Sequence, residues 1–388
     1  MNFSYYIPTR ILFGKGQLSN LSAQELPGKK AMIVTSCGGS MEKYGYLARV
    51  QEQLKKAGVD YAVYNKILPN PIKDHVMEAA QLVRETGCDF ILGLGGGSSI
   101  DSAKAIAVMA PNTGDYWDFI SGGTGKDITP PVDPLPVVAI TTTAGTGTEA
   151  DPWTVITKSE TNEKIGGGYD KTFPVLSIVD PDLMMSVPPV LTAYQGFDAL
   201  FHSTEGYLNN TANVMSDMYA LKSIELIGKS LAQAVHHGDD QQARADVALA
   251  NTLAGMVEST SGCISEYSLA HAMSALSPQL VHGAALIMIS REYYTRFIEM
   301  GACPERFVQM AKALGKADAC RPMDFVDALV SLLESCGVDG LKMSDYFSLE
   351  DLKAISQNSR DTMGSLYSKD PMVLSAEDEL IVLKKSYK

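Results

Sequence analysis

An acidic side chain and an imidazole stand four residues apart in the segment 196–202. Asp198 and His202 lie where the pattern predicts the start of a helix. Residues four apart on a helix project from one face, one turn apart. A carboxylate oxygen and an imidazole nitrogen placed in this way are suited to hold a divalent metal ion. The sequence therefore offers two candidate metal ligands on a single helix.

A glycine-rich turn follows the predicted strand at 89–94 and precedes a predicted helix. Glycines let the backbone approach a pyrophosphate closely, and the first N–H groups of the following helix can donate to it. We expect Ser98 to cap this helix and Asp101 to complete a box-like cap. Three consecutive glycines followed by two serines favour phosphate binding over an ordinary tight turn. The candidate cofactor-binding residues here are Gly95, Gly96, Gly97, Ser98 and Asp101.

A second polar turn, at 141–149, follows the predicted strand at 136–140. Its hydroxyl and N–H groups would lie at the carboxyl end of a strand, the edge at which doubly wound folds bind ligands. Neither turn places Gly-x-Gly-x-x-Gly after the first strand, so an ordinary Rossmann fingerprint is absent. Together the two turns predict one nucleotide-binding crevice. The second turn contributes the candidates Thr142, Thr143 and Thr146.

The elements that must position these residues fall into two halves. From about residue 30 to about residue 185, β-rich runs alternate with helical patterns, which is typical of a parallel sheet covered by helices. Beyond Val187-Pro188-Pro189 the pattern favours helices throughout. We therefore expect an α/β dinucleotide-binding domain at 1–187 and an all-α domain at 188–388. Strands are predicted at 31–35, 61–64, 89–94 and 136–140, and helices at 42–57, 191–208, 211–236, 241–260, 265–276 and 304–314.

Composition excludes several classes of partner. The formal net charge of −13 opposes binding to nucleic acid and to anionic lipid surfaces. No apolar run is long enough to span a bilayer, and residues 1–10 lack the pattern of a secretory signal. The six cysteines show no Cys-x-x-Cys spacing, which fits reduced thiols. We expect a cytoplasmic protein that binds neither nucleic acid nor a membrane and that forms a homodimer or larger homo-oligomer.

Three motifs, at 95–101, 142–149 and 196–202, resemble in this order those of the iron-containing alcohol dehydrogenase family. The similarity extends from 7–14 to 281–284. The resemblance implies a fold like that of dehydroquinate synthase, with an N-terminal α/β nucleotide domain and a C-terminal helical metal domain. It also implies chemistry in the cleft between the two domains. The expected activity is interconversion of a small alcohol and an aldehyde with a nicotinamide dinucleotide.

The same resemblance implies a set of metal ligands and one departure from it. Asp198, His202 and His282 match ligands of the family, and His271 matches a histidine near the nicotinamide, where it could relay a proton. The remaining ligand position is occupied by Tyr267. A phenol with an ordinary pKa of about 10 is a poorer ligand than imidazole. Three outcomes stay open: a metal completed by water or Tyr267, a weak site, or no metal.

The end of the first strand bears on which nucleotide is used. Members of the family that prefer NAD carry an acidic residue there, which would repel a 2′-phosphate. This chain has the small residues Gly38, Gly39 and Ser40 instead. We therefore expect NADP(H) to be preferred over NAD(H).

In the expected reaction, Fe²⁺ or Zn²⁺ at the three ligands would polarise the substrate oxygen of an alcohol or aldehyde. Two rival functions remain possible for the same sequence. A glycerol dehydrogenase-like polyol oxidoreductase shares the expected architecture. Alternatively, Tyr267 fills the metal site, and the chain is a nucleotide-binding protein without catalysis.

Overall fold

A computed structural model of the protein describes residues 2–388 and divides into two compact units. The α/β unit comprises Tyr6–Thr143 and Gly147–Ser186. The helical unit comprises residues 2–5, Ala144–Thr146 and Val187–Lys388. The short segment Ala144–Thr146 thus packs with the helical unit, although its neighbours in the sequence on both sides belong to the α/β unit.

Six parallel strands form the sheet of the α/β unit, in the order β1-β8-β5-β4-β2-β3. The strands β4, β5 and β8 are buried along their whole length, as expected for parallel strands covered on both faces. The predicted class, an α/β unit followed by a helical one, is confirmed. The strands of the sheet are β1 (Arg10–Phe13), β2 (Lys30–Ser36), β3 (Asp60–Ile67), β4 (Phe90–Gly95), β5 (Val137–Thr141) and β8 (Leu176–Val179).

Some elements of the α/β unit differ from their prediction. The helix expected at 42–57 is two helices, α1 (Ser40–Lys43) and α2 (Tyr46–Lys56). Gly45 between them has φ 72°, a left-handed conformation that cannot continue a right-handed helix. The antiparallel pair β6 (Thr154–Lys158) and β7 (Glu163–Gly167) was not predicted, because each strand is short and lacks a clear apolar alternation.

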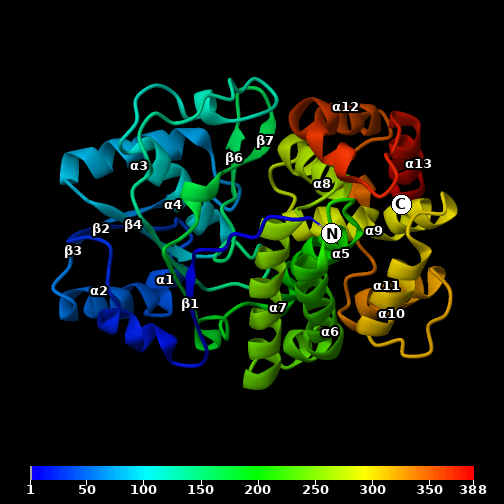
Figure 1. Ribbon diagram of the computed structural model, residues 1–388, viewed down its shortest axis with the longest axis horizontal. Coiled ribbons are helices and arrows are strands. Elements are labelled where there is room, and N and C mark those ends of the chain that lie inside the picture. The colour runs from blue at the N-terminus through cyan, green and yellow to red at the C-terminus, as the bar shows by residue number, and fades with distance from the viewer. Residues whose placement is uncertain (1) are drawn as a thin grey trace. The chain divides into compact units, whose positions relative to one another are not determined.

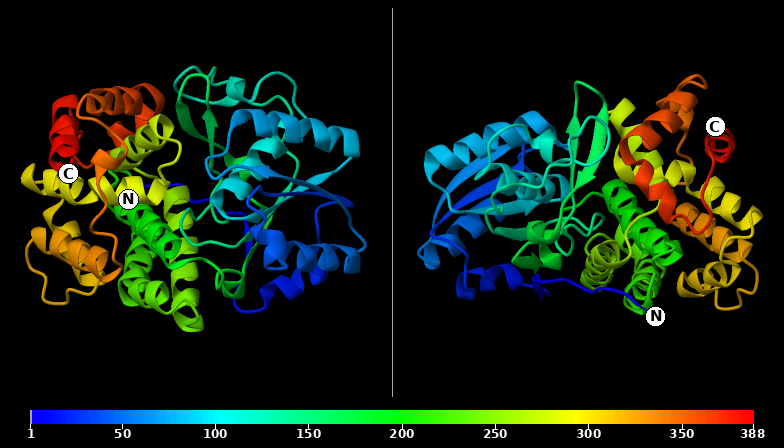
Figure 2. Two further views of the ribbon diagram at one scale, coloured as in Figure 1. Left: turned by 180° about the vertical axis from the view of Figure 1, so that it is seen from behind. Right: turned by 45° about the horizontal axis from the view of Figure 1, so that its top comes forward.

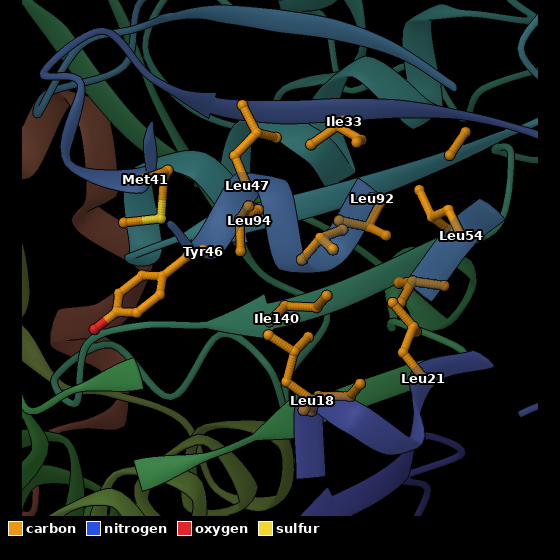
Figure 3. Packing of buried hydrophobic residues seen from close by; sticks show 14 of the residues in the cluster. Leu18, Leu21, Ile33, Met41, Tyr46, Leu47, Leu54, Leu92, Leu94 and Ile140 are labelled. Atoms are coloured by element: carbon orange, nitrogen blue, oxygen red, sulfur yellow. The ribbon is translucent and has the colours of Figure 1, made fainter. Parts of the chain in front are cut away.

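Helices cover both faces of the sheet (Figure 1). On one face lies α2 with the 3-10 helix η1 (Gln17–Ala23), and on the other lie α3 (Lys73–Thr86) and α4 (Gly97–Met109). In Figure 3, Leu47 of α2 lies beside Leu94 of the sheet, and Leu18 of η1 lies beside Ile140. Each such buried leucine or isoleucine stabilises the fold by about 1.5–3 kcal/mol. This packing fixes the carboxyl ends of β4 and β5, where the predicted nucleotide turns begin.

The helical unit is built around α5, α6 and α7, which pack against one another (Figure 2). Pro189 is the first residue of α5, a position at which the missing N–H of proline has no cost. All five helices predicted in this half are present. The helices are α5 (Pro189–Leu208), α6 (Val214–His236), α7 (Gln241–Thr260), α8 (Ser265–Leu276), α9 (His282–Glu299), α10 (Pro304–Ala313), α11 (Met323–Ser335), α12 (Asp351–Met363) and α13 (Ala376–Ser386). Further 3-10 turns are η2 (Tyr116–Phe119), η3 (Asp170–Thr172), η4 (Pro181–Leu183), η5 (Met343–Asp345) and η6 (Gly364–Lys369).

Two expectations from composition can be compared with the structure. Within residues 2–388, no helix combines the length and the apolar character needed to cross a membrane. All six cysteines are free thiols, as their spacing predicts. The chain therefore relies on packing and hydrogen bonds, and not on disulfides, for its stability.

Candidate active site

The helical unit brings Asp198, His202 and His282 together. Asp198 and His202 lie one turn apart on α5, and His282 is the first residue of α9. Asp198 Oδ1 is 3.7 Å from His202 Nε2 and 3.7 Å from His282 Nε2. His202 Nε2 is buried and makes no hydrogen bond. Asp198 Oδ1 thus lies near both imidazole nitrogens, and a carboxylate oxygen with two imidazole nitrogens is a donor set that suits a divalent cation.

The protonation state of His202 also suits a metal ligand. Burial lowers the pKa of the His202 imidazole to about 4, against an opposing hydrogen bond with Gly145. The ring is therefore neutral at neutral pH, the form that binds metals. Its Nδ1 lies 3.2 Å from the Gly145 carbonyl oxygen and 3.4 Å from Glu258 Oε1. Glu258, on α7, was not singled out in the sequence, since nothing in the local pattern of that helix points to His202.

Helix α8 brings Tyr267 and His271 to the same place. The Tyr267 ring centroid lies 5.1 Å from that of His202, 4.3 Å from that of His271 and 4.7 Å from that of His282. The His271 and His282 rings lie 5.0 Å apart. The phenol ring therefore contacts all three imidazoles of the cluster. The structure brings together every candidate metal and catalytic residue of the helical half.

In the α/β unit, the predicted nucleotide turns begin at one edge of the sheet. Gly95 at the end of β4 pairs with Thr141 at the end of β5, and Thr142 N donates to the Gly95 carbonyl at 2.9 Å. Strand β2 lies next to β4, and the strand order reverses between them. Open parallel sheets bind ligands at such a switch point. Gly38, Gly39 and Ser40 follow β2 at this point, and Gly39 has φ 68°.

The glycines of the first turn allow neighbouring side chains to lie close to its backbone. A Cβ on Gly96 would lie 2.8 Å from Thr143 Oγ1, so the two turns touch. Gly95 has φ 146°, and a Cβ there would lie 2.5 Å from Ser99 Oγ. The predicted cap is wrong. Helix α4 begins after Gly96 without a side-chain cap, and Ser98 Oγ donates instead to the Pro69 carbonyl at 2.5 Å.

Comparison with known proteins identifies the family. The model of the iron-containing alcohol dehydrogenases matches residues 8–181, and the model of the C-terminal part of that family matches residues 192–387. The chain belongs to the iron-containing alcohol dehydrogenase family. The family is one of iron-containing alcohol dehydrogenases, so the protein is an oxidoreductase of this type.

The sequence of this family member is similar to those of two dehydrogenases along almost its whole length. It is 30% identical over 385 residues to alcohol dehydrogenase 4 of Saccharomyces cerevisiae (strain YJM789), covering 99% of this chain and 98% of that one. It is 30% identical over 390 residues to the NAD-dependent methanol dehydrogenase of Bacillus methanolicus, covering 99% of both.

Solved structures of the family share the fold. An archaeal halo-thermophilic alcohol dehydrogenase from a Red Sea brine pool superimposes with a TM-score of 0.95 at 35% identity, covering 100% of this chain and 99% of that one. A 1,3-propanediol oxidoreductase superimposes with a TM-score of 0.89 at 29% identity, covering 100% of both chains.

Asp101 of this family member faces the interior of the α/β unit. Its Oδ1 accepts from Thr148 Oγ1 at 2.7 Å, and its Oδ2 accepts from Val155 N at 2.9 Å. Burial raises the pKa of the Asp101 carboxyl to about 6, against the opposing charge of Lys104. The carboxylate thus does not cap α4 as predicted. It supports the second turn at Thr148, where that turn ends.

Lys104 anchors the same turn and was missed in the sequence. Its ammonium is fully buried and donates to Thr148 Oγ1 at 2.7 Å and to Asp151 Oδ1 at 3.0 Å. It also donates to the Asp151 carbonyl at 2.9 Å and to the Trp153 carbonyl at 2.8 Å. A single lysine within the apolar run of α4 was the available signal, since a buried charge requires such partners.

Buried polar groups hold the start of α8, which carries Tyr267. The Ile264 N–H donates to Glu205 Oε2 at 2.7 Å, and the Ser265 N–H donates to Asp370 Oδ1 at 3.0 Å. The first N–H groups of a helix have no hydrogen-bond partner within the helix. Carboxyl oxygens at this position accept from them and also interact favourably with the positive end of the helix dipole. No local sequence pattern indicates this arrangement, because Glu205 and Asp370 are far from α8 along the chain.

Asp370 leads to a prediction for stability against pH. Burial raises the pKa of its carboxyl to about 7, whereas an unfolded aspartate titrates at about 3.9. A raised folded-state pKa contributes stability that is complete below about pH 4 and is lost as the pH rises toward 7. The loss reaches up to about 1.4 kcal/mol per pH unit.

The variant Asp370→Asn removes this titration while keeping an acceptor oxygen. We expect the stability of Asp370→Asn, relative to the wild type, to increase between pH 5 and pH 7 in urea unfolding experiments. Glu205 and Glu266 are present in both proteins, so the difference between the two curves reports the Asp370 carboxyl together with its effect on Glu205. Parallel stability profiles would show that Asp370 is ionised throughout this range.

Proposed function

We propose that the protein is an alcohol dehydrogenase and aldehyde reductase that uses NADP(H) and a divalent metal, Fe²⁺ or Zn²⁺. The observation that carries this proposal is the position of Asp198 Oδ1, 3.7 Å from Nε2 of both His202 and His282. The bound metal supplies Lewis-acid chemistry at a substrate oxygen, and the bound nucleotide supplies or accepts the hydride.

The residues of the chain have distinct roles in this proposal. Asp198, His202 and His282 hold the metal, and burial keeps His202 neutral for that task. His271 carries a proton at an imidazole nitrogen as the substrate oxygen gains or loses one. Its ring is buried and contacts Tyr267 and His282. The burial of Asp198, His202 and His271 limits access of bulk water to the reacting atoms.

The nucleotide binds at the switch point of the sheet in this proposal. The turns after β2, β4 and β5 supply backbone N–H groups and threonine hydroxyls to the phosphates. The absence of a carboxylate among Gly38, Gly39 and Ser40 supports NADP(H), although several relatives are NAD- or NADH-dependent by name. We also propose a small alcohol or aldehyde as the substrate.

Gly38 provides a direct test of nucleotide choice. No atom lies within 4 Å of a Cβ built at Gly38, and its φ is outside the left-handed region, so an aspartate fits there. We expect Gly38→Asp to lower the ratio of kcat/KM for NADPH to that for NADH by roughly 10- to 100-fold, through charge repulsion with the 2′-phosphate. The variant Gly38→Asn, with the same shape and no charge, should change the ratio much less. An unchanged ratio in Gly38→Asp would contradict the proposed position of the 2′-phosphate.

The function is tested on protein purified without oxygen. Its metal content is measured by elemental analysis, and oxidation of NADPH is followed with short aldehydes before and after addition of Fe²⁺ or Zn²⁺. One equivalent of metal and metal-dependent turnover are expected. Absence of turnover with metal bound would reject this substrate class.

A second candidate function is favoured by one observation. The Tyr267 ring lies against the rings of His202, His271 and His282, at the position of a family ligand. If the phenol replaces the metal, the protein binds a nucleotide without catalysis. Nucleotide binding with neither metal nor turnover in the same experiment would select this function.

A further inference from the structure

Glu258 is a buried carboxylate with no role in the proposed chemistry. It lies on α7, its side chain is 8% exposed, and its Oε1 is 3.4 Å from His202 Nδ1. We propose that Glu258 is a positioning residue which, with the Gly145 carbonyl, keeps the proton of His202 on Nδ1 and leaves the Nε2 lone pair facing Asp198 and His282. The effect of this positioning role on metal binding rests on the proposed function.

The surroundings of the two ring nitrogens support a single tautomer. The neighbours of Nδ1 are the Gly145 carbonyl oxygen at 3.2 Å and Glu258 Oε1 at 3.4 Å, and both are hydrogen-bond acceptors. A proton on Nδ1 can be donated to the Gly145 carbonyl, and it also faces the Glu258 carboxylate. A proton on Nε2 would instead set the Nδ1 lone pair against two acceptors, and its nearest carboxylate oxygen, Asp198 Oδ1 at 3.7 Å, lies beyond hydrogen-bond distance.

The position of the Gly145 carbonyl depends on close packing. A Cβ on Gly145 would lie 3.0 Å from the Cα of Gln195 on α5, so the backbone at this point approaches the helix more closely than most residues allow. The carbonyl therefore reaches Nδ1 from one side, and Glu258 on α7 adds a carboxylate oxygen. A carboxylate behind a metal-binding histidine orients the ring and raises its basicity.

Cys263 offers a competing interpretation of the same residues. Its thiol donates to Glu258 Oε2 at 3.8 Å, and His202, Glu258 and Cys263 each place a ligand atom within 4.8 Å of the others. A second metal ion bound through His202 Nδ1 would have to displace the proton shared with the Gly145 carbonyl. That contact, 3.2 Å long, favours the positioning role.

The first measurement is the tautomer of His202 in the full-length, metal-free protein. The chain has six histidines, so nitrogen-15 labelling of histidine gives few NMR signals, and the variant His202→Gln identifies those of His202. We expect a neutral ring protonated on Nδ1 in the wild type. In Glu258→Leu, the Nδ1 signal should shift or both tautomers should appear. A proton on Nε2 in the wild type would overturn the proposal.

The second measurement is the affinity for Zn²⁺, determined by competition with a chromophoric chelator. Loss of such a supporting group lowers metal affinity by about 10- to 100-fold, which we expect for Glu258→Leu. Glu258→Gln keeps the shape and an acceptor oxygen, and it should restore part of the affinity. Cys263→Ala is the matched control and should bind one equivalent with affinity within about twofold of the wild type.

The outcomes separate the proposal from its rivals. Unchanged affinity in both Glu258 variants overturns the positioning role. Two equivalents of Zn²⁺ in the wild type, with one lost in Cys263→Ala, overturn it in favour of a second metal site. An Nδ1-protonated His202 that responds to Glu258→Leu, in a protein that binds no Zn²⁺, supports the positioning of the ring while rejecting the proposed metal-dependent function.

Discussion

Replacing Asp198 by alanine should reduce kcat/KM for aldehyde reduction by at least about 10³-fold, because a Lewis acid contributes several kcal/mol to such a reaction. Asp198 Oδ1 lies 3.7 Å from Nε2 of both His202 and His282 and so joins the two imidazoles. Its removal leaves two imidazoles without the carboxylate that joins them. Bound metal should fall well below one equivalent, as measured by elemental analysis of the purified variant.

The nucleotide provides the internal control for this experiment. Apart from Ala144–Thr146, the predicted nucleotide turns belong to the α/β unit, whereas Asp198 lies on α5 of the helical unit. We therefore expect the Kd for NADPH to stay within about threefold of the wild type. The exposed residue Asp239 serves as a matched site, and Asp239→Ala should retain full turnover. Normal turnover or full metal content in Asp198→Ala would contradict the proposed metal site.

Replacing Lys104 by methionine should destabilise the α/β unit by about 3–5 kcal/mol, the usual cost of removing one partner of a buried ion pair. Methionine fills much of the same space, so the effect reports the lost charge and hydrogen bonds. Asp151 Oδ1 and the Trp153 carbonyl would lose the donor that lies 3.0 Å and 2.8 Å away, respectively. Urea unfolding followed by circular dichroism measures the change.

Two further variants show whether the unpaired Asp151 carboxylate causes this loss of stability. Lys104→Met combined with Asp151→Asn removes the uncompensated charge and should recover part of the stability. The exposed pair of Lys56 with Glu52 gives the surface control, and Lys56→Met should change stability by less than about 0.5 kcal/mol. Equal stability of Lys104→Met and the wild type would mean that water or another donor replaces the ammonium.

The sequence by itself determined the class of fold and the family, and it supplied most residues of the candidate site. The strands β2, β4 and β5 appear as short apolar runs that lead into glycine or threonine turns, and this local pattern needs no tertiary information. Asp198 and His202 share one helix, so their spacing alone placed them together. Motifs in the correct order identified the family, and with it His271 and His282.

The local sequence pattern gave a wrong prediction for the cap of α4, because long-range contacts direct the side chains involved. Ser98 and Asp101 have the spacing of a helix cap, but their side chains bind Pro69, Thr148 and Val155 instead. A buried carboxylate is directed by the strongest donors that the fold brings within reach, and these lie about 50 residues further along the chain. Sequence spacing cannot report them.

Only the tertiary structure decided what surrounds the candidate ligands. Glu258 and the Gly145 carbonyl reach His202 Nδ1 from α7 and from the second turn, and Asp370 reaches the start of α8 from beyond α12. Each contact joins residues separated by roughly 50 or more positions. Such partners are fixed by the packing of whole elements, because burial forces every polar group to find an acceptor or donor wherever the fold supplies one.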